Sequence, residues 1–459
     1  MQPSFTSAIA ANRFGLGARP GELAAIGADA RDWLLAQLKG GAPALPDSTL
    51  QSSVQILASA LRLRRDIQAE RKAGEDVQQK LPQFLKPIYV SEVTARFAAA
   101  VATERPFVER LTQFWANHFA VSIDKQFLAG LAGSFEREAI RPHVLGNFTE
   151  LLLAVEKHPA MLLYLDNHLS VGPHSPAAAR AERRQSERKI GINENLAREI
   201  LELHTLGVGG GYTQKDVTTF AEVITGWSIG GEGGRFAQGE PGMFVFREEL
   251  HEPGTKVVLG RSYADEGFLQ GAAVLRDVAR TRAAANFIAT KLTRHFLADD
   301  PPPAVVERVA DVFMHSGGDL PRVYRALIDS SEAWTQPLAK YKTPCDYVIS
   351  SYRGLSLPVE GHAPLAPFEL LGQRTWQPGS PAGWPDRSAD WDGASALIKR
   401  IQWADAVGAR LGSGRDAAQL APQLLGANLS EATRTAVARA ASAEQAVTLL
   451  LAAPEFMRR

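Results

Sequence analysis

Apolar residues recur three and four positions apart along most of this chain, which is the spacing of one face of an α-helix. The pattern is clear over residues 22–38, 91–118, 135–169 and 268–334. Alternating apolar and polar positions favour a β-hairpin only in residues 243–260, MFVFREELHEPGTKVVLG. The sequence therefore predicts a mainly α protein, a large multi-helix globular fold with one small β-hairpin region. We expect helix content well above the roughly one third of residues found in ordinary globular domains.

We expect residues 1–459 to form a single large helical domain. Residues 1–80 would form its N-terminal helical segment, residues 81–360 a core that holds the main motif cluster, and residues 361–459 a C-terminal helical segment. No internal repeat supports a solenoid. Residues 171–189, VGPHSPAAARAERRQSERK, are small, polar and basic, which is typical of an exposed, mobile loop.

Composition limits the class of protein. The chain has 459 residues, of which 45% are hydrophobic and 22% charged, enough for a substantial core. Lys+Arg and Asp+Glu both total 50, so no net charge favours nucleic acid or an anionic membrane as a partner. The one cysteine, Cys345, excludes an intramolecular disulfide framework and a cysteine zinc cage, and we interpret it as structural.

Membrane and export signals are also missing from the sequence. No window approaches 18 uninterrupted apolar residues, so we predict no membrane-spanning helix. Residues 1–17, MQPSFTSAIAANRFGLG, lack the basic start and the long apolar run of a signal peptide. The expected location is therefore the cytoplasm.

The densest group of informative residues lies in residues 191–227, GINENLAREILELHTLGVGGGYTQKDVTTFAEVITGW. The pattern predicts a helix, a glycine break and a second helix. Asn193 or Asn195 can cap the first helix, because a short side-chain oxygen accepts from free N–H groups of the first turn. Thr213 with Asp216 three residues later resembles a capping pair for the second helix.

Two interpretations of the polar face of the first helix remain open. Asn195, Glu199 and Glu202 share one face, and a second row, Glu194, Arg198 and Glu202, lies beside it. In the first interpretation, Glu194, Arg198 and Glu202 form a row of exposed ion pairs that contributes a few tenths of a kcal/mol per pair. Alternatively, Glu199 and Glu202 are paired carboxylates that face a cavity or a metal.

Polar residues in apolar surroundings supply further candidates. His204 lies nearer the apolar side of the first helix, and His118 lies within the apolar segment FWANHFAVS. Each could be a hydrogen-bonded core histidine or a functional one. Asp166 ends an apolar helical segment just before a loop, where it could cap the helix or act as a ligand.

Several separated motifs occur along the chain in this order: RFGLGARPGEL, FWANHF, HPAMLLYLDN, NENLAREILELHTLGVGGGYTQKDV with ITGW, HEPGTKVVLG, FIATKLTRHF, GQRTWQPGSPAGWPD and LLAAPEF. Together they resemble a bacterial family called "domain of unknown function 1800". The resemblance implies that the polar motif residues are signature positions of the family: Asn117, His118, Asp166, Asn193, Glu194, Asn195, Arg198, Glu199, Glu202, His204, Trp227, His251 and Lys256.

The resemblance also implies a partner and a second location. Such proteins are often encoded beside a sulfatase-like companion of the alkaline-phosphatase superfamily that carries an export signal. Family members are often exported, so export with a partner is the alternative to a cytoplasmic location.

The first functional hypothesis is an enzyme with a carboxylate/histidine site between helices, with or without a divalent metal as its cofactor. Mixed carboxylate and imidazole ligands would suit Zn, Mn or Fe better than Ca. A metal-free version would use a glutamate as general base. The proposed catalytic residues are Glu199, Glu202, His204 and Arg198. The proposed substrate-binding residues are Asn193, Asn195, Trp227, His251 and Lys256, and the proposed metal ligands are His118 and Asp166.

The second hypothesis is a non-catalytic accessory or scaffold protein for the sulfatase-like companion. Its contact surface would be the Trp- and Gly-rich segment 373–391. A third hypothesis, a glycan-binding or glycoside-processing protein, depends only on aromatic loops and carboxylates. The metal content of the protein and the three-dimensional positions of the carboxylates and histidines distinguish these hypotheses.

The segment 171–189 should be the internal region that trypsin cuts first, because it is basic and has no apolar stripe to hold it against a core. Limited digestion followed by mass spectrometry of the first fragments measures this. Initial cleavage elsewhere, with this segment intact, would show that the segment is ordered.

Overall fold

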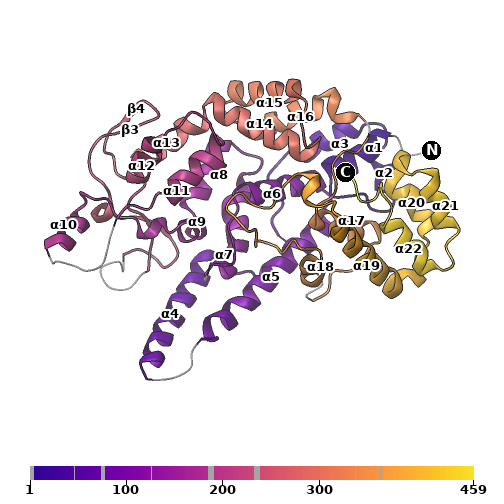
Figure 1. Ribbon diagram of the computed structural model, residues 1–459, viewed down its shortest axis with the longest axis horizontal. Coiled ribbons are helices and arrows are strands. Elements are labelled where there is room, and N and C mark those ends of the chain that lie inside the picture. Colours follow the sequence, from indigo (N-terminus) through magenta and orange to yellow (C-terminus); the bar gives the residue numbers. More distant parts are fainter. Residues whose placement is uncertain are drawn as a thin grey trace.

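Helices make up most of the protein, as Figure 1 shows. The computed structural model describes residues 5–45, 47–73, 78–125, 127–183, 191–231, 238–335, 337–361 and 364–459. The structure is 62% helical, with 22 α-helices and two small antiparallel hairpins in the described ranges, which confirms the predicted mainly α fold. Among these residues, none of the helices combines the length and apolar character that a membrane crossing requires.

The first part of the chain forms a projecting arm and a central helix. Helices α4 and α5 form a hairpin that extends away from the body, and α6 lies near the middle of the molecule (Figure 1). The elements are α1 (Phe5–Ile9), π-helical η1 (Ala10–Phe14), α2 (Glu22–Ile26), α3 (Ala30–Gln37), α4 (Ser53–Lys72), α5 (Lys80–Ala102), α6 (Pro106–His118), α7 (Leu128–Phe135), π-helical η2 (Glu136–Ile140), η3 (Arg141–His143), α8 (Phe148–Lys157) and α9 (Pro159–Tyr164).

The middle of the chain contains both hairpins and the helices that pack around them. Its helical elements are η4 (Asn167–Leu169), α10 (Pro176–Arg183), α11 (Asn195–Glu199), π-helical η5 (Ile200–Thr205), α12 (Gln214–Val223), η7 (Glu248–Leu250), α13 (Phe268–Ala279) and α14 (Arg282–Phe296). The strands are β1 (Trp227–Ile229), β2 (Phe244–Phe246), β3 (Lys256–Val258) and β4 (Arg261–Tyr263).

The last part of the chain adds a pair of helices beside α14 and a C-terminal group of helices. These elements are α15 (Pro303–Ser316), α16 (Leu320–Asp329), η8 (Ser331–Trp334), α17 (Pro344–Gly354), α18 (Leu365–Leu370), η9 (Ser388–Asp390), α19 (Ala394–Leu411), η10 (Gly412–Gly414), α20 (Ala417–Leu425), η11 (Gly426–Asn428), α21 (Glu431–Ala438) and α22 (Ala443–Leu451). Helix α19 packs along α22, and α14 packs along α15.

The predicted hairpin region contains strands, but they pair differently from the expectation. Strand β2 pairs with β1, so Trp227 lies opposite Phe246, and β3 pairs with β4 across a turn at Leu259 and Gly260. The segment around His251, in the middle of that region, connects the two hairpins. Alternation within a segment identifies a strand, but it does not identify the strand's partner.

Helix α6 is the centre of the core. Pro106 begins it, in the first turn, where the missing N–H costs no intrahelical hydrogen bond. Its side chains are buried on nearly every side of the helix. Trp115 Nε1 donates to the Tyr324 hydroxyl at 2.6 Å, and that hydroxyl donates to the Val144 carbonyl at 2.9 Å. These bonds satisfy the polar atoms of two large buried side chains and join α6 to α16 and to the segment after η3.

Buried ion pairs join α5 and α6 to the π-helical segment η2. Arg141 binds Glu109 of α6 through two hydrogen bonds of 2.6 and 2.8 Å, and it binds Glu136 at 3.0 Å. The second oxygen of Glu136 binds Arg96 of α5 at 2.6 Å. Each charge in this network is paired with and hydrogen-bonded to an opposite charge, which is the condition under which buried charges are tolerated.

The predicted mobile loop at residues 171–189 is only partly as expected. Residues 176–183 form the helix α10, and Val171 and Ala177 are buried against Leu250 in a small apolar cluster. The loop prediction was wrong for these residues, because two apolar side chains are enough to hold a short helix against the hairpin connection. Residues 184–189 lie outside the described ranges.

Replacing Glu109 with Gln should lower the free energy of unfolding by about 3–5 kcal/mol, because it leaves a buried Arg141 charge without its bidentate partner. Urea denaturation followed by circular dichroism measures the change. The control is Arg322→Gln, which removes an exposed pair with Asp319 and should cost well under ~1 kcal/mol. Equal small losses in both variants would contradict the role of the network.

Candidate functional site

The stretch from residue 191 to 227 forms the predicted helix, glycine break and second helix. The Asn193 side-chain oxygen accepts from the Asn195 backbone N–H at 2.9 Å, and Thr213 and Asp216 cap α12 reciprocally. Gly207, at the break, has a φ of 83°, which suits glycine. The local sequence signals therefore identified both helix starts and the break.

The predicted row of ion pairs in this stretch is present only in part. Arg198 binds Glu194 at 2.8 Å, both side chains are about one-third exposed, and Asn195 is exposed. Glu202, the expected third member, is hydrogen-bonded to Tyr212 instead of Arg198. Glu194 and Arg198 therefore form a surface pair of small energetic value.

His204 and Glu199 lie in different surroundings from this row, because residues 200–205 form a π-helix. The Leu206 N–H donates to the Leu201 carbonyl, five residues back, and the wider turn changes which side chains share a face. His204 is buried, and its Nδ1 donates to the buried Glu156 carboxylate at 2.8 Å. Burial raises the pKa of Glu199, which is half-buried, and the nearby Glu202 charge adds to this effect.

The other site residues predicted from the sequence lie in several parts of the fold, where each contacts its own structural neighbours. Trp227 is fully buried against Phe244 and Phe268, and His251 Nδ1 donates to the Thr225 carbonyl at 2.9 Å. The Lys256 ammonium donates to three backbone carbonyls at 2.6–3.3 Å. Asp166, with a left-handed φ of 57°, forms an ion pair with Lys125 at 2.5 Å. The Asn193 amide lies 3.5 Å from the Asp166 carbonyl.

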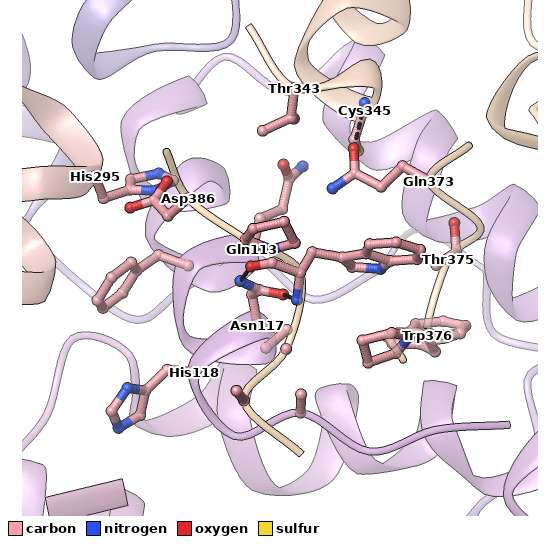
Figure 2. A pocket seen from close by; sticks show the side chains of 18 of the residues that line it. Gln113, Asn117, His118, His295, Thr343, Cys345, Gln373, Thr375, Trp376 and Asp386 are labelled. Atoms are coloured by element: carbon pink, nitrogen blue, oxygen red, sulfur yellow. Dashed lines mark hydrogen bonds and ion pairs between the residues drawn. The ribbon is translucent and has the colours of Figure 1, made fainter. Parts of the chain in front are cut away.

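A cavity of about 560 Å³ lies between α6, α14, the start of α17 and the Trp- and Gly-rich segment 373–391. Its volume is in the range of small-molecule sites. Figure 2 shows His295 and Asp386 side by side at one side of this cavity, with His118 nearby, and Gln373, Thr375 and Trp376 across from them. Of the sequence-predicted site residues, His118 is the one that lines it.

Asn117 fixes segment 373–391 over the cavity. Its side-chain amide donates to the Trp384 carbonyl at 2.9 Å, and its side-chain oxygen accepts from the Trp384 N–H at 2.7 Å. Gly383 has a φ of 82°, and a side chain there would collide with the Asn117 carbonyl oxygen. Asn117, a polar position in an apolar segment, therefore holds this loop against α6.

His295 of α14 and Asp386 form a hydrogen-bonded pair in the cavity wall. His295 Nδ1 donates to the Asp386 carboxylate at 3.2 Å, and its Nε2 is buried and has no protein partner among the described residues. Burial lowers the pKa of His295 to about 4, although the Asp386 charge opposes this. His295 is therefore neutral at pH 7 and holds an unshared electron pair on Nε2.

His118 places a second free nitrogen in the cavity wall. Its Nε2 donates to the His204 backbone carbonyl at 3.1 Å, and its Nδ1 is buried without a partner in the described part of the chain. Burial and the Lys291 charge hold the pKa of His118 well below its usual value, so the ring is neutral. The Phe114 ring lies 6.2 Å from the His118 ring and 5.3 Å from the His295 ring, centre to centre.

Two free hydrogen-bond donors complete the polar lining. The side-chain nitrogens Gln113 Nε2 and Trp384 Nε1 are buried and have no partner in the described protein. Buried polar atoms are normally hydrogen-bonded, so several unpaired ones on side chains that line one cavity leave hydrogen-bonding capacity around it.

The cavity wall is supported by buried charges behind it. Burial would raise the pKa of Asp386, but His295, which is protonated in the acid range where this carboxyl titrates, and the charges of Lys340 and Arg459 outweigh burial and lower that pKa to about 2. Lys340 also donates to the Asp386 backbone carbonyl and binds Asp299 at 2.6 Å. The Asp386 carboxylate is therefore ionised and fixed, which holds the His295 ring in one orientation.

The predicted metal ligands are held by other partners. His118 binds the His204 carbonyl, and Asp166 binds Lys125. Within the described ranges, no group of three or more His, Cys, Asp or Glu side chains is placed to hold a metal ion. Cys345 lines the cavity, and burial raises the pKa of its thiol to about 11, so it is a protonated thiol at pH 7.

Sequence analysis missed His295, Asp386 and Lys291. Their motifs, FIATKLTRHF and GQRTWQPGSPAGWPD, are visible in the sequence. The first places Lys291 and His295 four residues apart on one helix face, which is a signal that could have been used. The second contains Asp386, but its pairing with a histidine 91 positions away has no local signal.

The fold and the site define a large helical protein with a histidine-lined cavity closed by a Trp- and Gly-rich loop. The chain belongs to the family described as Protein of unknown function (DUF1800), whose model matches residues 9–458. No curated protein and no solved structure matches the chain.

His295 should make the protein less stable in acid. Its folded pKa of about 4 lies below the ordinary value of 6.5, so the unfolded state takes up a proton that the folded state refuses. Stability should therefore fall as the pH decreases from about 6.5 to about 4, by about 3 kcal/mol from this group.

Urea denaturation between pH 7 and pH 4 measures this loss. His295→Asn should reduce the acid-induced loss, because asparagine does not titrate. The control, His315→Asn, changes an exposed histidine of α15 and should keep the wild-type profile. An unchanged profile in His295→Asn would contradict the neutral, buried state of His295.

Proposed function

We propose that the protein is an enzyme that performs acid–base chemistry on a small molecule bound in the cavity between α6 and α14. The proposal keeps the predicted carboxylate/histidine site between helices, but it assigns the proton transfer to His295 and Asp386. The observation that carries it is the free, buried Nε2 of His295, whose Nδ1 is fixed by a carboxylate at 3.2 Å.

The protonation states support this role. A general base is efficient when it is deprotonated at the working pH and lies within hydrogen-bond reach of the proton that it removes. With a pKa of about 4, His295 is available as a base at neutral pH. Asp386, ionised and held by Lys340 and Arg459, would stabilise the imidazolium that forms when the base takes up a proton.

His118, Gln113 and Trp384 would orient the substrate. The first offers a hydrogen-bond acceptor, and the other two offer donors, all buried in the cavity wall. The chemistry that fits this set is removal of a proton from a substrate hydroxyl or from a water molecule, followed by return of the proton to a leaving group. A metal-dependent version of the proposal would use the same free imidazole nitrogens as ligands, and elemental analysis of the purified protein distinguishes the two versions.

The sequence-predicted group around Glu199 has a supporting role in this proposal. The His204 carbonyl accepts from His118 and so fixes its tautomer, with the proton on Nε2 and the free electron pair on Nδ1. Glu156 in turn binds His204 at 2.8 Å. Such outer hydrogen bonds determine which nitrogen of a histidine is available. Glu199, Glu202 and Arg198 stay proposals as catalytic groups, and they are not among the residues that line the cavity.

A second proposal is an accessory protein for a sulfatase-like companion, with which it would leave the cytoplasm. It is supported by three exposed apolar side chains of α19, Leu397, Ile398 and Ile401, of the kind that partner surfaces contain. This proposal places the partner on α19 instead of on segment 373–391, whose Trp384 and Trp391 are partly or fully buried. Co-elution of the two co-expressed proteins, lost on Ile398→Glu, would support it.

The enzyme proposal is tested with chromogenic p-nitrophenyl carboxylate esters, phosphate esters, sulfate esters and glycosides. We expect turnover of at least one class, with an acid limb near pH 4 that reports His295. His295→Asn keeps a nitrogen that can donate to Asp386 but removes the free base, so kcat should fall by roughly 10²–10⁴-fold.

His315→Asn is the matched control and should keep the wild-type kcat. Wild-type kcat/KM in His295→Asn would overturn the proposal. The absence of turnover of all four classes by the wild-type protein would favour the accessory protein instead.

A further inference from the structure

Helix α14 brings two cations to the cavity beside His295. Arg294 and His295 follow Lys291 by three and four positions, so the three side chains lie toward one side of the helix. All three side chains line the cavity. The proposed base therefore has positive charge next to it on the same rigid element.

These two cations differ from the others in the cavity wall. Four cavity arginines each have a carboxylate partner: Arg96 with Glu136, Arg110 with Asp346, Arg374 with Glu369, and Arg387 with Asp300. Lys291 and Arg294 have no ion pair among the residues that the structure describes. The Lys291 ammonium lies 5.5 Å from the Phe287 ring centre, and Arg294 Nε donates to the Asp299 backbone carbonyl at 3.0 Å.

The surroundings of Lys291 show that its charge is incompletely balanced. Burial lowers the pKa of Lys291 to about 8. The Arg294 charge acts in the same direction as burial, and the Asp386 charge acts in the opposite direction. The Lys291 charge also lowers the pKa of His118, so this ammonium lies close to that histidine. A partly buried cation without a counter-ion is unfavourable, and a bound anion would remove that cost.

We infer that Lys291 and Arg294 form an oxyanion subsite, so that the ligand of this cavity carries a sulfate, phosphate or carboxylate group held beside His295. This inference rests on the proposed function and names its substrate class. Charge-assisted hydrogen bonds from a lysine and an arginine are strong and suit such groups. Gln113 Nε2 and Trp384 Nε1 add neutral donors in the same cavity.

Isothermal titration of the full-length protein with sodium sulfate, sodium phosphate and sodium acetate tests the subsite and shows which oxyanion it prefers. We expect millimolar or tighter binding of at least one of them. Lys291→Met and Arg294→Met should each weaken that binding by tenfold or more. Arg374→Met is the matched control, because it removes a cavity arginine whose charge is already paired, and it should keep the wild-type Kd.

The pH dependence supplies a second readout. Sulfate does not titrate in this range, so its binding should weaken as the pH rises through about 8 and Lys291 loses its proton. The charged and titratable neighbours of Lys291 are Arg294 and His295 on its own helix, Asp386 of segment 373–391 and His118 of α6. Asp386 is ionised and both histidines are neutral near this pH, which leaves Lys291 as the group that changes. Lys291→Arg should retain binding and lose this alkaline limb.

Folding of the variants is checked by their melting temperatures. Removing an unpaired, partly buried charge should leave the Tm of Lys291→Met unchanged or raise it, so weakened binding would not be a consequence of unfolding. If Lys291→Met lowers the Tm strongly, Lys291→Gln supplies the binding comparison. Wild-type affinity in the folded Lys291 variants, or no oxyanion binding by the wild-type protein, would overturn the subsite.

These variants distinguish failure of the subsite from failure of the proposed function. His295→Asn should bind the oxyanion with the wild-type Kd while losing turnover. Retained turnover in His295→Asn, together with weakened binding in Lys291→Met, would leave the subsite standing and remove the proposed base. Lost turnover in His295→Asn, together with wild-type oxyanion binding in the Lys291 and Arg294 variants, would keep the proposed base and remove the subsite.

Discussion

The Arg459 guanidinium, buried between two carboxylates, is the interaction on which the rest of the site depends. Its Nε lies 2.8 Å from the Asp346 carboxylate, its Nη2 lies 3.8 Å from that of Asp386, and its Nη1 donates to the His295 carbonyl at 2.6 Å. Asp346 also binds Arg110 of α6 at 3.0 Å. One cation therefore joins α6, α14, α17 and segment 373–391 around the cavity. Removing it would leave two buried carboxylates with fewer partners.

Local signals in the sequence predicted the helices well. The capping pair of Thr213 and Asp216 and the glycine break at Gly207 both depend on contacts within a few residues. Such contacts are determined by the nearby sequence. For the same reason, the predicted pairing of Glu194 with Arg198, four residues apart on one helix, is present in the structure.

The site was harder to predict, for two physical reasons. The helical spacing assumed for Glu199, Glu202 and His204 is that of an α-helix, whereas residues 200–205 wind more widely and direct His204 to Glu156. The pair of His295 and Asp386 forms between elements 91 positions apart, so only the packing of the whole chain creates it. His118 was the exception, because a polar side chain in a strongly apolar segment is a local signal.

The fastening of segment 373–391 has a kinetic consequence. Asn117 holds the Trp384 backbone with two hydrogen bonds, and Lys340 and Arg459 lie against Asp386. Swinging this segment outward would separate buried charges, at a cost of several kcal/mol. The segment is therefore a fixed wall of the cavity. Arg374 and Arg387, both about half exposed, belong to the lining of the same cavity. Association of a charged ligand should then depend on salt concentration, and a gating motion of this segment should contribute no slow phase.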